Sequence, residues 1–388
     1  MPVFKGKKPS FRAKWIVGSC LSFLLLSLAS CQQSANVKVE EQPSSSDSPI
    51  NQGLVLDNAT LEQADEEGKI LWKLNAEKTV YSKDKKSAQL ENLIGNLFED
   101  GEIVMQLSAK RGEIQEDGEV ILLRENITAN DVRNGAILQA EELDWLTTEN
   151  ILIARNNLVG KHSKLEASAN EGKYYSQEQR LELMGKVLAT AKEPLLQLKT
   201  EKLLWQIPQE KVISDRPLEI DQFQEQTVTD RLKAGKGEMN IQTKIITLQN
   251  NIELKSLDPA IQVASHFATW NVDKRILQTD KPIKMIDRQE QLSLTGNQGQ
   301  VNLETEVATL TGGVEGINFR NQGKLYSNQL TWQIPTQLLQ AQGNVIYQQA
   351  NPPLTLTGPT AVGRLQENNL VVTGNNQGQR VVTEIIPN

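Results

Sequence analysis

One pattern of apolar and small positions recurs along most of the chain. An apolar residue is followed two places later by a small one, and small or apolar residues follow three and five places after that, as in Leu138, Ala140, Leu143 and Trp145. The small residue, here called the anchor, recurs ten times, at Ala76, Ala109, Ala140, Ala167, Thr200, Ala234, Ser265, Gly296, Ser327 and Gly358. Successive anchors lie 27 to 34 residues apart, most often 31. Such a period is typical of stacked-repeat proteins.

Each repeat predicts a strand, a turn and a second strand. A further apolar residue stands eighteen places after most anchors, for example Ile94, Ile127 and Leu158, and twenty places after the fourth, at Val187. Short polar stretches such as residues 147–150 separate the two halves and consist of residues that favour turns. The chain lacks long stretches in which apolar residues recur every three or four positions, as they do in amphipathic helices. We therefore expect an all-β protein.

The spacing within the first strand of a repeat predicts a bulge. The anchor and the residue two places before it share one face of a regular strand, whereas positions three and five after the anchor fall on the other face. All four are apolar or small in most repeats, so one extra residue after the anchor would return them to the same side. Alternate repeats carry Gly112, Gly237 and Gly299 three places after the anchor, where a strand glycine often marks a bend.

The other repeats carry a tryptophan five places after the anchor. Because these two kinds of repeat alternate, we interpret the true period as two repeats and expect successive repeats to belong alternately to two facing sheets. In a closed sandwich the tryptophans would fill the core, whereas in a splayed one they would line a groove. The predicted groove residues are Leu138, Leu143, Trp145, Leu198, Leu203, Trp205, Val263, Trp270, Leu325, Leu330 and Trp332.

The first 31 residues have the composition of a processing segment. Five basic residues precede an apolar run over residues 16–28, and the segment ends with Leu-Ala-Ser-Cys at residues 28–31. This tetrad resembles the lipobox of bacterial lipoproteins, in which the cysteine is acylated, so we predict lipidation at Cys31. The alternative is an uncleaved membrane anchor, although the run is shorter than the roughly 20 residues that a spanning helix needs. Both place the body outside the cytosol, on a flexible linker over residues 32–52.

Charge and residue content exclude several functions. The formal net charge is -7, and removal of the five basic residues in the first segment gives -7 - 5 = -12, which is unsuitable for nucleic acid. Cys20 and Cys31 are the only cysteines, so the body has no disulfide. The two histidines, His162 and His266, are far apart and lack further ligands at metal-binding spacing. We therefore expect no catalytic residues, no metal and no cofactor.

The repeats resemble those of the OstA/LptC family of lipopolysaccharide transport proteins. The resemblance rests on Leu-x-Ala units, each followed by a Leu-x-Gly-x-Val-like second strand, such as residues 165–167 followed by 183–187. It covers residues 54–375. Together with a membrane-tethering N-terminus, the chain is most similar to LptC in a long form such as cyanobacteria carry. Proteobacterial LptC is much shorter and is usually held by a transmembrane helix, which leaves open whether the extra repeats replace a separate LptA-like bridge protein.

The resemblance implies an elongated open β-jellyroll over residues 53–384 that acts as a periplasmic bridge component. Its groove would hold the acyl chains of lipopolysaccharide and pass them from an inner-membrane ABC transporter toward the outer membrane. Each buried methylene would contribute about 0.8 kcal/mol. The expected partners are that transporter, near residues 71–81, and an LptA-like bridge or outer-membrane translocon, near residues 354–373, both joined by strand addition. The alternatives are a passive scaffold lipoprotein without lipid cargo and a β-helix enzyme acting on polysaccharide.

Overall fold

The fold was analysed in a computed structural model, which describes residues 52–193, 195–257, 260–367, 369–374 and 381–384. The predicted signal segment, the lipidation site Cys31 and the linker up to residue 51 lie outside the described residues. The chain divides into two units, Met1–Ser48 and Pro49–Asn388, and all described residues belong to the second.

The described residues form strands joined by short turns, with one 3-10 turn (Glu116–Gly118) and no α-helix. The strands are β1 (Gln52–Ala64), β2 (Ile70–Ser82), β3 (Ala88–Glu99), β4 (Glu102–Gln115), β5 (Val120–Asp131), β6 (Ala136–Leu146), β7 (Ile151–Lys161), β8 (Leu165–Tyr175), β9 (Arg180–Lys192), β10 (Leu195–Gln206), β11 (Lys211–Ser214), β12 (Leu218–Gln224), β13 (Thr227–Ala234), β14 (Lys236–Asn240), β15 (Ile245–Ser256), β16 (Ile261–Asn271), β17 (Ile276–Thr279), β18 (Ile283–Asp287), β19 (Leu292–Gly296), β20 (Gln298–Asn302), β21 (Val307–Asn318), β22 (Gly323–Gln333), β23 (Leu338–Gln349), β24 (Leu354–Arg364), β25 (Asn369–Thr373) and β26 (Val382–Glu384).

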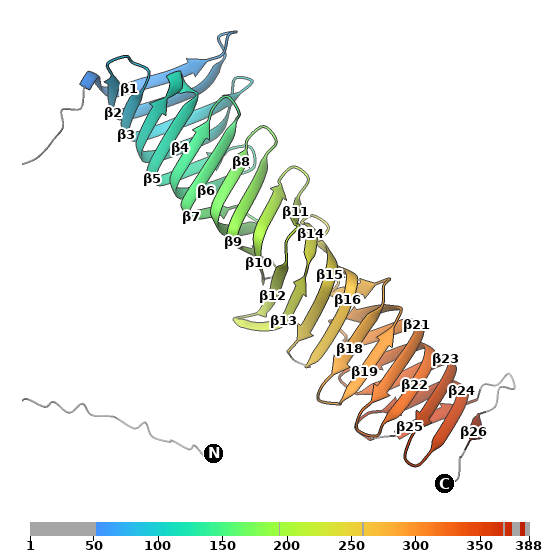
Figure 1. Ribbon diagram of the computed structural model, residues 1–388. Helices are drawn as coiled ribbons and strands as arrows, with labels where there is room; N and C mark the ends of the chain where they lie inside the picture. The colour runs from blue at the N-terminus through green and yellow to red at the C-terminus, as the bar shows by residue number, and fades with distance from the viewer. Residues whose placement is uncertain (1–51, 194, 258–259, 368, 375–380, 385–388) are drawn as a thin grey trace, which may run out of the picture. The chain divides into compact units, whose positions relative to one another are not determined.

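The strands form one continuous antiparallel sheet, shown in Figure 1, in which each long strand pairs with the long or split strands next to it in the chain. Some strands are split into two short ones, such as β11 and β12, and both parts then pair with the same preceding strand, β10. Each anchor residue lies in a different strand, and the next long or split strand completes the repeat. The predicted all-β stack of strand-turn-strand repeats is confirmed.

From β4 onward, a bulge interrupts each long strand near its middle. Between β5 and β6 the pairing passes from Arg124 with Glu142 to Ile127 with Ala140, so Glu141 is one extra residue after the anchor, as expected. The strand opposite contributes two extra residues, Glu125 and Asn126, both with positive φ. The left-handed backbone conformation is unfavourable for most residues, and glycine and asparagine tolerate it best. The neighbouring bulges accordingly contain Asn-Asn, Gly-Lys, Gly-Gly or Gly-Asn pairs.

The bulge divides each long strand between two facing walls. The tryptophan wall comprises the strand halves that carry Trp145, Trp205, Trp270 and Trp332, together with the halves paired with them; the anchor wall comprises the halves that carry the anchors. Pairing is continuous along each wall, as between β5, β6 and β7. The expectation that successive repeats alternate between two sheets is therefore wrong, because every long strand contributes to both walls of a single folded sheet.

The glycines three places after the anchor have a different role from the predicted one. Gly112, Gly237 and Gly299 have no positive φ. A Cβ atom at Gly112 would approach Leu93 Cδ2 to 2.9 Å, and one at Gly237 would approach Leu218 Cδ2 to 2.7 Å. These glycines therefore make room for bulky neighbours in the core and do not bend the strand.

Ile94, the apolar residue eighteen places after the first anchor, does not face the core as the repeat pattern predicts. It is 60% exposed, and its neighbour Leu93 is buried instead.

The space between the walls is filled by two clusters of buried apolar side chains. The first runs from Trp72 to Val212 and the second from Leu196 to Leu365, and partly buried Leu198 and Met239 pack against both. The two clusters therefore meet near β10 to β12, and together they form a core that is continuous along the stack. This arrangement follows from the repeats, because each repeat packs mainly against its neighbours.

The edges of the sheet differ from expectation at one end. The predicted N-terminal edge near residues 71–81 lies in β2, but β1 covers β2 and pairs with it along most of its length. Sequence reasoning missed β1 because it carries no anchor and its side chains are mostly exposed. At the other end, β25 and β26 each pair with β24 on one side. The predicted C-terminal segment, residues 354–373, therefore does lie at the end of the described sheet.

Candidate functional site

The interior between the walls is the candidate functional site, and all eleven predicted groove residues point into it. Leu143, Trp145, Leu330 and Trp332 have no exposed surface, and Leu203, Trp205, Val263, Trp270 and Leu325 are at most 7% exposed. Leu138 and Leu198 are partly buried and pack against the core. Burial at these positions follows from the bulge, which turns both halves of each strand toward the interior.

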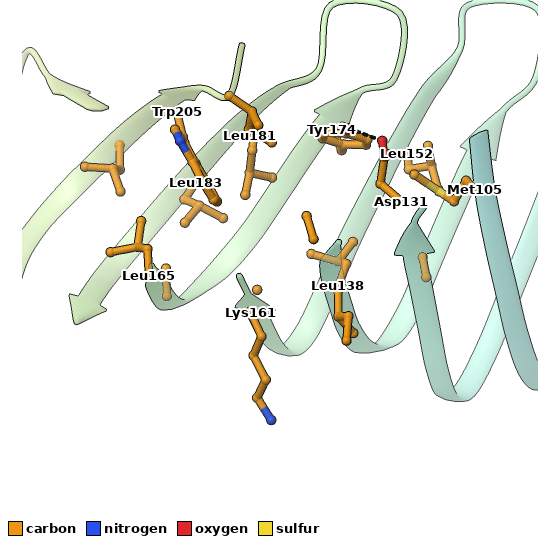
Figure 2. A pocket seen from close by; sticks show the side chains of 17 residues that line it. Met105, Asp131, Leu138, Leu152, Lys161, Leu165, Tyr174, Leu181, Leu183 and Trp205 are labelled. Carbon is orange, nitrogen blue, oxygen red and sulfur yellow. Dashed lines mark hydrogen bonds between the residues drawn. The ribbon is translucent and has the colours of Figure 1, made fainter. Parts of the chain in front are cut away.

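Two neighbouring apolar cavities lie near the middle of the stack. The first contains about 650 Å³ of free space and the second about 710 Å³, in both cases including space open to solvent. Leu165 from the anchor wall and Leu203 from the tryptophan wall line both of them. Figure 2 shows the first cavity, where Leu138 and Leu165 lie opposite Leu181 and Trp205. The apolar lining of both cavities suits apolar ligands.

The predicted groove residues divide between cavity linings and packed core. Leu138, Leu203 and Trp205 line the first cavity, Leu198 lines the second, and Val263 and Leu325 line two further, more polar cavities toward the C-terminus. Leu143, Trp145, Trp270, Leu330 and Trp332 contact none of these cavities. They lie in the closely packed interior between the walls. The spacing thus identified the inward face but not which inward positions border free space.

The four tryptophans have a further feature in common. The indole Nε1 atoms of Trp145, Trp205, Trp270 and Trp332 are buried and have no hydrogen-bond partner among the described residues. An unpaired buried N–H group costs about 1–3 kcal/mol. The tryptophans are therefore held by the packing of their rings rather than by polar contacts of the indole nitrogen.

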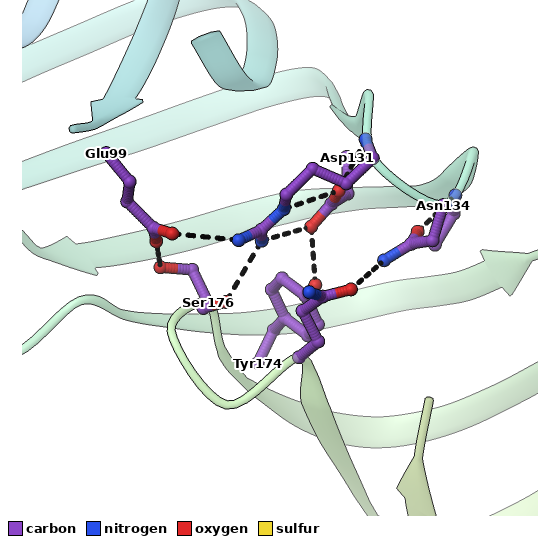
Figure 3. Close-up of polar contacts among 8 residues, drawn as sticks. Glu99, Asp131, Asn134, Tyr174 and Ser176 are labelled. Carbon is purple, nitrogen blue, oxygen red and sulfur yellow. Dashed lines mark hydrogen bonds and ion pairs between the residues drawn. The ribbon is translucent and has the colours of Figure 1, made fainter. Parts of the chain in front are cut away.

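A polar network crosses from one wall to the other beside the first cavity, as Figure 3 shows. At the anchor-wall rim, Glu99 ends β3 and Asp131 ends β5, and Arg133 lies in the next turn. Arg133 Nη2 donates to Asp131 Oδ2 at 2.6 Å, and Arg133 Nη1 donates to Glu99 Oε2 at 2.8 Å. From the tryptophan wall, Tyr174 Oη donates to Asp131 Oδ2 at 2.6 Å, and Ser176 Oγ donates to Glu99 Oε1 at 2.9 Å. Both Asp131 and Tyr174 line the first cavity.

The bond between Tyr174 and Asp131 joins a neutral hydroxyl to an ionised carboxylate at neutral pH. Burial raises the pKa of the Asp131 carboxyl, but hydrogen bonds from Arg133 and Tyr174 outweigh burial and leave that pKa below its ordinary value. Burial and the Asp131 carboxylate both raise the pKa of Tyr174, so its hydroxyl keeps its proton. A protonated phenol bonded to an ionised carboxylate is among the stronger hydrogen bonds in proteins.

Sequence reasoning missed Glu99, Asp131, Arg133 and Tyr174. Asp131 and Tyr174 are 43 residues apart and fall outside the four repeat positions. Their contact exists only because the strand ends of both walls meet at the rim. A carboxylate at an inward position, two places after the inward Ala129, was the one available signal in the sequence.

The two histidines occupy different surroundings, and neither belongs to a metal cluster. His162 packs edge-on against the ring of Trp205 at a centroid distance of 5.1 Å, and burial lowers its pKa. His266 is exposed. Within the described part of the chain, no group of three histidine, cysteine or acidic side chains could hold a metal ion. No helix in that part is long and apolar enough to cross a membrane.

Comparison with known proteins identifies the family. The model of the LptC-related lipopolysaccharide-assembly family matches residues 20–158 and 218–319, together more than half of the chain. No curated protein matches the chain. The unmatched stretch between the two segments, residues 159–217, supplies most of the lining of the first cavity, including Leu181, Leu183 and Trp205. On its repeats, its folded sheet and this match, the chain belongs to the LptC-related family of lipopolysaccharide-assembly proteins.

Proposed function

We propose that the chain binds the acyl chains of lipopolysaccharide between its two walls and passes them along the stack toward the outer membrane. The family implies a part in lipopolysaccharide assembly, as a transport component and not as an enzyme. The observation that carries the proposal is the pair of adjoining apolar cavities that share Leu165 and Leu203. Hydrocarbon chains suit such an apolar lining because burial of each methylene gains about 0.8 kcal/mol.

The surrounding surface favours an amphiphile over a wholly apolar ligand. Lys161 lines the first cavity and Lys164 the second, and both flank the turn between β7 and β8 at the anchor-wall rim. An acyl chain between the walls would place its polar end near these ammonium groups. A phosphate on that end would gain a charged partner at Lys161, whereas Lys164 Nζ already lies 2.8 Å from Glu210 Oε1.

A photo-crosslinking experiment tests this function. We expect a photoreactive amino acid at Leu203 of the full-length protein to label purified lipopolysaccharide, because Leu203 is 1% exposed and borders both cavities. The same amino acid at Lys202, which alternates to the outer face, should give background labelling only. Deacylated lipopolysaccharide should label at neither position. Equal labelling at both positions would instead favour the scaffold lipoprotein.

The route to and from the protein is part of the same proposal. Residues 1–31 would tether the chain to the inner membrane through lipidated Cys31 or as an uncleaved anchor, next to the ABC transporter that drives transport. With β1 at the N-terminal edge, strand addition at that end would use β1 and not the segment predicted from the repeats. An LptA-like bridge or the outer-membrane translocon would add to the C-terminal edge, in a long cyanobacterial-type chain.

Proline at the C-terminal edge tests the strand addition. Val371 lies in β25 and is 58% exposed, whereas the neighbouring Val372 packs partly against the core. We expect Val371→Pro to abolish photo-crosslinking from Thr373 to the partner in cell envelopes, because proline removes a backbone donor. The thermal midpoint should hardly change. Val371→Thr keeps the donor and serves as the control, and persistent crosslinking by the proline variant would contradict edge pairing.

A further inference from the structure

The two rims are joined by side chains and not by backbone. Along each rim, turns donate backbone hydrogen bonds to the neighbouring turn or strand end of the same wall, as from Ser176 N to Asn150 O and from Val132 N to Val104 O. The other backbone hydrogen bonds at the rims of the described stack either close a single turn, as from Gly135 N to Asp131 O, or join segments of the same wall. Opening between the rims therefore breaks no backbone bond of the sheet, and only side-chain contacts resist it.

Side-chain contacts between the rims gather around the first two cavities. Besides the bond between Tyr174 and Asp131, Arg133 Nη2 donates to Ser176 O at 2.9 Å and Asn134 Nδ2 donates to Gln179 Oε1 at 3.1 Å. Beside the second cavity, Lys164 Nζ lies 2.8 Å from Glu210 Oε1. The first group is the better shielded, because Asp131 is 2% exposed and Tyr174 is 6% exposed.

We propose that Glu99, Asp131, Arg133 and Tyr174 form a latch that holds the rims together over the first cavity and opens to admit or release a hydrocarbon chain from the side. The proposal rests on the proposed function, since it concerns entry to the same interior. Figure 3 shows Tyr174 reaching from the tryptophan wall to the Asp131 carboxylate. Arg133 binds the same carboxylate from the anchor wall.

The composition of the latch suits a closure that must reopen. Apolar side chains in these positions would extend the core to the rim and close the cavity by packing. The latch instead consists of hydrogen bonds and ion pairs, and water can replace each of these when the rims part. Arg133 keeps Glu99 and Asp131 paired on the anchor wall during opening, because both bonds lie within that wall. Parting of the rims thus breaks the bonds made by Tyr174 and Ser176 and leaves no carboxylate without its arginine.

Removal of one hydroxyl tests the latch. Lipopolysaccharide bound to the full-length protein would be chased with excess unlabelled lipopolysaccharide. We expect Tyr174→Phe to accelerate both uptake and release of lipopolysaccharide about tenfold, because the variant loses a hydrogen bond to a charged group. The dissociation constant should change little, because the latch is closed before and after binding. Tyr175→Phe is the matched control, since Tyr175 carries the Arg180 guanidinium 3.7 Å above its ring and takes no part in the network.

A covalent bridge provides the opposite test. With Cys20 and Cys31 replaced by serine, Asn134→Cys and Gln179→Cys would be joined by a short reducible bismaleimide across the rims. We expect exchange of lipopolysaccharide to stop in the bridged protein and to resume after reduction. The control pair, Lys78→Cys and Glu91→Cys, joins neighbouring strands of one wall and should not slow exchange.

The outcomes separate the latch from the function on which it rests. If the wild-type protein binds no lipopolysaccharide, the proposed function fails. If it binds but exchanges at the same rate with the rims bridged, the function stands and the latch is wrong. If Tyr174→Phe raises the dissociation constant together with the release rate, Tyr174 has a packing role, which also overturns the latch.

Discussion

Trp145→Ala is expected to lower the free energy of unfolding of the N-terminal part of the stack by about 3–5 kcal/mol, as large-to-small changes in packed cores do. Trp145 has no exposed surface and lies in the first of the two core clusters. Its removal leaves a void that Ile121 and Leu152, its partners on the neighbouring strands, cannot close without moving the backbone. The expected loss is a large part of the stability of a typical domain.

Hydrogen exchange followed strand by strand is the measurement that checks this expectation. Amides of β5, β6 and β7 should exchange faster in Trp145→Ala, while those of β21 to β23 keep wild-type protection, because coupling in a stack runs mainly between neighbours. Trp332→Ala is the reciprocal variant, since Trp332 is equally buried in the second cluster. Equal acceleration throughout the sheet in both variants would show that the two clusters unfold as one unit.

The second large effect is expected at the bulges. Asn156 and Asn157 follow each other in the left-handed region, with φ of 59° and 54°, and both side chains are exposed. Valine in that conformation costs about 1–2 kcal/mol per residue. The double substitution Asn156→Val and Asn157→Val should therefore destabilise the protein by about 2–4 kcal/mol although it removes no core contact.

Glycine at the same two positions separates backbone strain from lost side-chain contacts. Asn156 Nδ2 donates to Glu142 Oε1 at 2.8 Å, and glycine removes this exposed bond as completely as valine does. We expect the double glycine variant to stay within about 1 kcal/mol of the wild type, because glycine adopts positive φ without steric cost. Denaturation midpoints followed by tryptophan fluorescence would compare the two variants. Similar losses in both would mean that the asparagine side chains, and not the backbone, stabilise the bulge.

The bulges show how far periodicity alone can predict this fold. The spacing of Ala140, Leu143 and Trp145 required an extra residue after the anchor, and Glu141 is that residue. The spacing could not show what the bulge does to the whole strand. A bulge that places both halves of a strand on one side is compatible with two separate sheets or with one folded sheet. The pairing of β6 with both β5 and β7 along its whole length decides for the folded sheet.

For the candidate site, the sequence likewise predicted which side chains face the interior but not where free space remains between them. All eleven predicted groove positions face the interior, because inward orientation follows from strand periodicity and the bulge. Free space between the walls depends on how side chains of different size meet across the interior. Leu203 borders two cavities, whereas Leu143, at the same repeat position, is completely enclosed. Lipid binding at these positions stays a prediction, which the crosslinking experiment addresses.

The sequence by itself determined the strand-turn-strand repeat, the bulge and the inward face, because each depends on residues close together along the chain. Only the tertiary structure decided that both walls belong to one sheet, that β1 forms the N-terminal edge of the described sheet and that Tyr174 meets Asp131 at the rim. These features bring together strands and turns whose distance in the sequence carries no periodic signal. Their contacts follow from the folding of each strand at its bulge, which places distant strand ends opposite each other.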